Sequence, residues 1–262
     1  MSTLAYIVAA SLVGGVASTI AAAGTLMLHR SWISRLVSFA VGALLGAVFL
    51  ELLPEALEEG EASTVMMTVL VGLLAFFLLE KLVLWRHSHG HDDGGEAEFE
   101  HDHAMAQADE HDHGRSGLMI LIGNSVHSLC DGIVIAASFL AGPALGLATT
   151  LAIVAHAIPQ QVGDFAILVH SGYGRYRAFL FNVASGTATL VGALAGYFAL
   201  SDLAQVLPMV LAIAASSLLY VAVADLIPSL HRRPEPVETA KQLALIGIGI
   251  GVIAVARLFL EH

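Results

Sequence analysis

Apolar stretches of similar length alternate with short polar segments along almost the whole chain. Eight can be read from the sequence, at residues 5–28, 36–57, 64–85, 116–140, 145–169, 178–200, 206–230 and 242–260. Each is close to the roughly 20 residues that an α-helix needs to cross the hydrocarbon core of a bilayer. The pattern predicts an all-α polytopic membrane protein in which residues 1–262 form a single transmembrane domain of eight helices.

Composition agrees with this prediction. Of the 262 residues, 57% are hydrophobic and 13% are charged, and the mean hydropathy is +0.80. A soluble domain cannot hide so much apolar surface. The N-terminal run MSTLAYIVAA has no positive charge ahead of its apolar part, so we interpret it as the first span rather than a cleaved signal peptide. The single cysteine, Cys130, excludes an internal disulfide framework.

The basic residues predict the orientation of the spans. If successive loops are assigned to alternate sides, ten of the eleven Lys and Arg residues fall on one side. The positive-inside rule assigns that side to the cytoplasm, so both termini are expected outside. Only Arg257 lies near the outer end of the last span, where its long side chain can snorkel toward water. The short N-terminal segment favours the cell (cytoplasmic) membrane as the location.

One loop differs from all the others. Residues 87–114, between the third and fourth spans, contain nine acids and no Lys or Arg, and they carry most of the net charge of −11. Because the rest of the chain is almost neutral, its charge implies no nucleic-acid partner. The low complexity of the loop predicts a disordered cytoplasmic segment that binds metal through closely spaced histidines. These are His87, His89, His91, His101, His103, His111 and His113.

Two of the apolar stretches carry a polar pair near the bilayer midplane. His127 precedes Asp131 by four residues, and His156 precedes Gln160 by the same spacing, so each pair lies on one helix face, a turn apart. Such groups are costly at this depth and usually serve ions, protons or substrates. Imidazole with carboxylate and amide oxygen suits a divalent transition metal, so the four side chains predict one metal site between two helices. The alternative is hydrogen bonding that only joins the helices.

The motifs around these pairs resemble those of the ZIP (Zrt/Irt-like protein) family of divalent metal transporters. HSLCDG at 127–132 is similar to the HNxxDG or HNxxEG signature of that family's fourth helix. HAIPQQVGD at 156–164 is similar to the fifth-helix HExPHExGD pattern of its histidine-rich branch, and segments 51–55 and 220–228 resemble its second and seventh helices. The resemblance implies eight spans, outside termini and no cofactor, with Zn2+, Fe2+, Mn2+, Cd2+ or Co2+ as the transported substrate.

Four positions depart from the family pattern. Ser128 and Ala157 replace the Asn and the acid that help to form a second, adjacent metal site in binuclear members, so a full binuclear centre is not implied. Gln160 and Gln161 replace a His or acid and a Glu. Asp131 then supplies the formal negative charge of the central site, and the family's metal preference does not carry over.

Other polar side chains are secondary candidates. Glu51 and Glu55, four residues apart at the outer end of the second span, are either cation-gathering groups at the entrance or interfacial residues. Asp164 and Asp225 lie toward the cytoplasmic ends of their spans and are candidates for an exit relay. Ser128 and Asn182 complete the secondary set.

The sequence therefore predicts transport of a divalent transition metal, with Zn2+ first, into the cytoplasm by alternating access at the midplane. An intramembrane metalloprotease is excluded because Ala157 and Gln160 stand where an HExxH motif needs its Glu and second His. A membrane metal sensor and a cation-diffusion-type exporter stay as alternatives. The expected partners are the metal ion and the lipid bilayer, with a homodimer as the candidate assembly.

Overall fold

A computed structural model describes residues 2–20, 30–88, 115–170, 172–201, 203–231 and 235–260. The regular structure in these ranges is entirely helical. Eight helical segments are long and apolar enough to cross a membrane, namely Thr3–Ile20, Ser34–Glu59, Ala62–Leu79, Ile122–Ala141, Pro143–Phe165, Arg175–Leu200, Leu207–Ala224 and Pro236–Leu258. The predicted all-α fold with eight spans is thus confirmed. The His-rich loop lies outside the described residues, apart from the backbone of His87 and Ser88.

Three of the spans contain a short π-helical segment, and five are uninterrupted α-helices. The first span joins α1 (Thr3–Leu12) to η1 (Val13–Ala17), and the second joins α3 (Arg30–Gly46), η2 (Ala47–Leu52) and α4 (Leu53–Glu59). α5 (Ala62–Ser88), α7 (Arg115–Ala141), α8 (Pro143–His170) and α9 (Arg175–Leu200) follow. After η3 (Ala204–Val206), the seventh span joins α10 (Leu207–Tyr220), η4 (Val221–Leu226) and α11 (Ile227–His231), and α12 (Pro236–Leu260) completes the chain.

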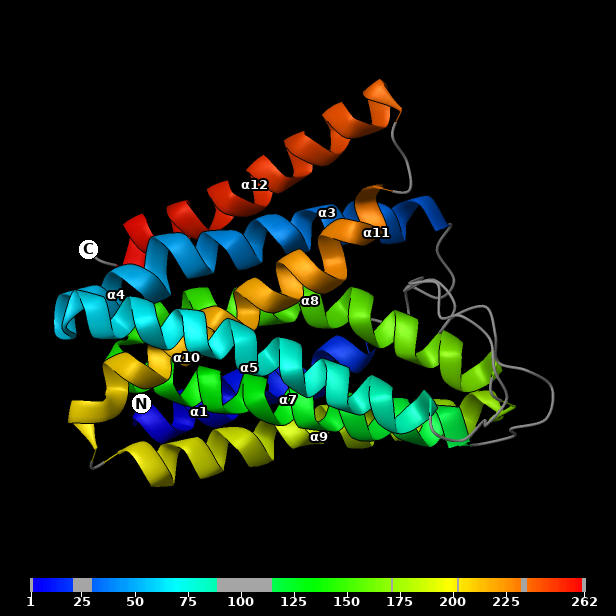
Figure 1. Cartoon of the computed structure of the whole chain (residues 1–262), viewed down its shortest axis with the longest axis horizontal. Helices are drawn as coiled ribbons and strands as arrows, with labels where there is room; N and C mark the ends of the chain where they lie inside the picture. Colours follow the sequence, from blue (N-terminus) through cyan, green and yellow to red (C-terminus); the bar gives the residue numbers. More distant parts are fainter. Residues whose placement is uncertain are drawn as a thin grey trace.

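The helices form one bundle with α7 and α8 near its middle (Figure 1). α9 packs against α7, α12 against α3, and α10 against α5. α1 begins and α12 ends at the same end of the bundle, whereas α5 ends and α7 begins at the opposite end (Figure 1). We call these the terminal end and the loop end. Under the positive-inside prediction, the loop end faces the cytoplasm.

Small residues let α7 and α9 approach closely. A Cβ on Gly132 of α7 would collide with the carbonyl of Thr189, and one on Gly192 of α9 would collide with the carbonyl of Leu129. In a bilayer, where apolar association gives little driving force, such close backbone packing is a main source of helix–helix stability. Gly132 directly follows Asp131, so the contact fixes the helix segment that carries this carboxylate.

The second and seventh spans share a local feature. In each, a π-helical segment contains an acid and is followed two residues later by a proline, with Glu51 and Pro54 in one and Asp225 and Pro228 in the other. Proline has no N–H, so the carbonyl four residues earlier loses its helical partner. π-Helical turns frequently occur at functional sites. Among the spans with a π-helical segment, the second and the seventh are the two that combine it with an acid and a following proline.

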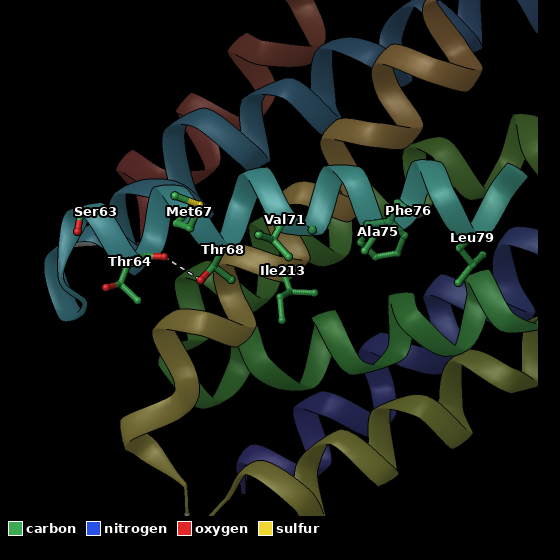
Figure 2. A pocket seen from close by; sticks show the side chains of 10 residues that line it. Ser63, Thr64, Met67, Thr68, Val71, Ala75, Phe76, Leu79 and Ile213 are labelled. Atoms are coloured by element: carbon green, nitrogen blue, oxygen red, sulfur yellow. Dashed lines mark hydrogen bonds between the residues drawn. The ribbon is translucent and has the colours of Figure 1, made fainter. Parts of the chain in front are cut away.

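A groove of about 710 Å3 runs along the side of α5 that carries Thr68 and Val71, next to Ile213 of α10 (Figure 2). Its lining is apolar apart from hydroxyl groups such as that of Thr68, which donates to the carbonyl of Thr64 at 2.8 Å (Figure 2). The groove contains no carboxylate or imidazole. An apolar groove on a largely exposed span suits lipid chains. The residues predicted to bind the metal do not line this groove.

Candidate metal centre

The first part of the centre lies on α7, where His127 and Asp131 are one helical turn apart. Nε2 of His127 is 3.6 Å from Oδ2 of Asp131. Asp131 is only 4% exposed, so its carboxylate is held inside the bundle. The predicted pairing of these two side chains on one helix face is what the structure has.

His156 on α8 supplies the third side chain of the centre. Nε2 of His156 is 3.4 Å from Oδ2 of Asp131 and 3.4 Å from Nε2 of His127. The ring is 1% exposed, and its Nδ1 lies 3.2 Å from the carbonyl of Ala152. A hydrogen bond from Nδ1–H to that carbonyl leaves the lone pair on Nε2, directed at the other two groups. The three ligand atoms lie within 4.8 Å of one another.

These separations match one face of a coordination tetrahedron. Ligand atoms about 2.0–2.1 Å from a tetrahedral zinc ion stand roughly 3.3–3.4 Å from each other. The three observed edges are 3.4, 3.4 and 3.6 Å. Two imidazole nitrogens and one carboxylate oxygen could therefore bind a divalent ion with little rearrangement, which leaves the fourth vertex for water or another side chain.

Gln160 lies one turn further along α8, as predicted, but the structure also gives it a partner. Its Nε2 donates to Oδ1 of Asn124 at 3.0 Å. Asn124 is buried on α7 and is an addition to the predicted site residues. Its position could be recognised from the sequence, because Asn124, His127 and Asp131 share one helix face at spacings of three and four. A role for Gln160 as the fourth ligand stays a prediction, because its carbonyl oxygen is the atom that would have to turn toward the ion.

Two neighbours of His127 have different surroundings. Ser128 is buried on α7, next to the centre in sequence. Cys130 is partly buried with a free thiol and is not part of the group formed by His127, Asp131 and His156. A thiolate ligand is therefore not suggested by the described residues, and Cys130 is better explained as a packing residue.

At the terminal end, Glu51 and Glu55 line a cavity of about 170 Å3 together with Glu58 and Arg257. Arg257 does not simply extend to water, because its Nη1 donates to the carbonyl of Leu50. Leu50 belongs to the π-helical segment η2, just before Pro54, where the backbone hydrogen bonds depart from the α-helical pattern. The predicted entrance acids thus lie beside a basic side chain from the last span, and Arg257 contacts the protein backbone in addition to the predicted snorkelling.

Toward the loop end, Asn182 of α9 is buried and donates from Nδ2 to the backbone carbonyl of Gln161 at 2.8 Å. Asp164 lies on α8 one turn beyond Gln160, with a buried carboxylate oxygen. The side chains of Asp225 and of the seven loop histidines lie outside the described part of the structure. Their expected roles in an exit relay and in metal binding stay predictions.

Comparison with known proteins agrees with a metal-binding site in this chain. The family profile described as ZIP Zinc transporter matches residues 2–257. Zinc transporter ZIP13 of Homo sapiens is 32% identical over 266 residues, covering 87% of this chain and 72% of that protein. Zinc transporter ZIP13 of Pongo abelii is 31% identical, with 87% and 68% covered, and the ZIP13 homolog of Drosophila melanogaster is 30% identical, with 87% and 78% covered.

Proposed function

Because this chain belongs to the ZIP family of zinc transporters, we propose that it carries Zn2+ across the membrane and into the cytoplasm. Members of the family are transporters and not enzymes, so the metal is substrate rather than cofactor. The observation that carries the proposal is the convergence of His127, Asp131 and His156 from two helices on one point inside the bundle. Such a group is costly in a membrane unless it binds an ion.

The centre explains how a hydrated ion can enter an apolar bundle. Two imidazoles and one carboxylate replace water ligands, and the carboxylate of Asp131 offsets one of the two positive charges. The residual charge makes binding weaker than in a site with two carboxylates. Moderate affinity suits a transporter, because an ion that binds too tightly does not leave. Since Ser128 and Ala157 lack the usual side chains, we infer a mononuclear centre.

Direction follows from the predicted orientation. The acids near Glu51 at the terminal end would gather cations outside, and the polar side chains beyond Gln160 would receive them on the cytoplasmic side. Alternating access then requires the two ends of the bundle to open in turn around the fixed centre. The π-helical segments of the second and seventh spans are the natural hinge positions, because their hydrogen bonds are already irregular. A location in the cytoplasmic membrane and a homodimeric assembly remain predictions.

Zinc uptake by proteoliposomes tests the proposal. Purified protein is reconstituted with a zinc-sensitive dye inside the vesicles, and its sidedness is measured by protease cleavage of the loop at 87–114. We expect saturable uptake from the side opposite to the loop. Cys130→Ala is a matched control on α7 and should transport normally. A protein that binds Zn2+ at the centre yet moves none across the vesicle membrane would be a sensor instead.

A further inference from the structure

Three buried oxygen atoms lie on α8 and α9 between the metal centre and the loop end. They are Oε1 of Gln161, Oδ2 of Asp164 and Oδ1 of Asn182, and none has a hydrogen-bond donor within the described parts of the chain. Gln161 and Asn182 are each 3% exposed. Two of the atoms are amide oxygens and the third belongs to a carboxylate, so when Asp164 is ionised all three are acceptors and cannot satisfy one another. Something that carries positive charge or donates protons is needed there.

Their placement on the two helices is well defined. Gln161 and Asp164 are three residues apart and so share a face of α8. Nδ2 of Asn182 donates to the backbone carbonyl of Gln161 at 2.8 Å, which brings the carboxamide of α9 to the same level. Because a carbonyl can only accept, this contact also fixes the amide orientation and turns Oδ1 away from that bond. The unsatisfied oxygens thus come from adjacent levels of neighbouring helices.

We propose that Gln161, Asp164 and Asn182 form a second cation site made only of oxygen ligands, and that the transported divalent ion occupies it after leaving the central one. This deepens the transport function proposed above and rests on it. The site lies about 7 to 12 Å from His156 along α8, judged from the helical rise. It differs from the adjacent second site of binuclear ZIP proteins, because it does not use the positions of Ser128 and Ala157.

The two sites differ in the type of ligand atom that they offer. The central site offers two imidazole nitrogens, which a borderline ion such as Zn2+ prefers, whereas the second offers a carboxylate and two amide oxygens, which suit harder ions such as Mn2+. A zinc ion therefore passes from stronger to weaker ligands as it moves toward the cytoplasm. Two sites of decreasing strength allow release without an unfavourable step into an apolar segment.

Anomalous diffraction tests the site directly. Crystals of the full chain are soaked in Mn2+, and data are collected above the manganese edge. We expect one peak at His127, Asp131 and His156 and another within coordination distance of Asp164. A peak at the central site without one at Asp164 overturns the second site alone. A peak at Asp164 without a central one overturns the central site instead, and a crystal with neither overturns both.

Paired variants test its role in transport. Asp164→Asn keeps the shape but removes the charge, and we expect the maximal rate of Zn2+ uptake to fall about 10-fold, the scale of losing one metal-supporting group, with the KM nearly unchanged. The double variant Gln161→Glu/Asp164→Asn restores one carboxylate to the proposed site, at position 161, one turn from position 164. The maximal rate of Zn2+ uptake should recover by severalfold relative to Asp164→Asn. A purely structural role for Asp164 would not be rescued in this way. A wild-type rate in Asp164→Asn, or no recovery in the double variant, overturns the inference.

Discussion

Nε2 of His127 and Nε2 of His156 face each other at 3.4 Å, although the residues are 29 positions apart and lie on different helices. The two rings are nearly perpendicular, with an interplanar angle of 74° and centroids 5.6 Å apart. Asp131 completes a triangle with them. Two imidazole lone pairs and a carboxylate cannot satisfy one another without a shared cation or proton. When both Nε2 atoms carry their lone pairs, the same three atoms can share one cation, and the following predictions depend on that arrangement.

Removal of one imidazole should abolish high-affinity transport. We expect His127→Ala or His156→Ala to weaken zinc binding by at least 10- to 100-fold, the cost associated even with supporting groups around a metal. Saturable uptake at micromolar Zn2+ should disappear while membrane insertion is retained. Uptake is compared at equal reconstituted protein, with Cys130→Ala as the control. Wild-type kinetics in both variants would show that the ion takes another route.

Restoration of an acid at position 160 should tighten binding. Gln160→Glu adds a second carboxylate near an ion that otherwise keeps a residual charge in a low-dielectric interior. The new side chain cannot donate to Asn124 as Gln160 does at 3.0 Å. Asn124 can compensate by rotation of its amide, because its buried Nδ2 has no hydrogen-bond acceptor among the described residues. We expect a lower KM and an equal or lower maximal rate.

The same variant should acquire a stronger pH dependence. A carboxylate binds metal only when it is deprotonated, so the gain in affinity is present at higher pH and is lost as acidification protonates Glu at position 160. Uptake measured at several pH values for Gln160→Glu and the unmodified protein checks this directly. If affinity and pH dependence both stay the same, Gln160 does not face the ion, and the fourth ligand comes from water or another helix.

Removal of the charge of Arg257 should favour cation capture. This side chain donates to the carbonyl of Leu50 and shares a cavity with Glu51, Glu55 and Glu58. In Arg257→Gln the cavity loses its only described basic group, and we expect the KM for Zn2+ to fall roughly two- to fivefold at low salt, the size of a partly exposed charge interaction. High salt should reduce the difference. Arg257→Lys is the matched control, and an equal KM for Arg257→Gln and the unmodified protein would remove the cavity from the pathway.

The loop should be dispensable for the transport step. Replacement of residues 87–114 by a Gly/Ser linker of equal length keeps α5 and α7 connected but removes all seven loop histidines. We expect saturable zinc uptake to persist, with a changed response to high cytoplasmic-side metal. Measurement with zinc added inside the vesicles separates transport from regulation. Complete loss of uptake in a correctly inserted variant would place the loop in the pathway.

The pattern of apolar residues along the sequence was sufficient to predict the helical fold. Apolar runs of membrane-spanning length leave the chain almost no alternative to helices, because a bilayer offers no water for unpaired backbone groups. The pairing of His127 with Asp131 could be predicted for the same reason, since residues four apart on a helix must share a face. The His-rich loop could be recognised by its composition, but a low-complexity sequence does not predict where its histidines lie in space.

Only the tertiary structure decided which of these faces meet. The contact of His156 with the α7 pair, the partner that Gln160 finds in Asn124, and the contact of Arg257 with the carbonyl of Leu50 all join different helices. Helical periodicity sets the direction in which each side chain points from the axis of its helix. It does not set the rotation and depth at which two helices pack. Those depend on close contacts such as Gly132 against Thr189, where the absence of a side chain on one helix admits the backbone of another.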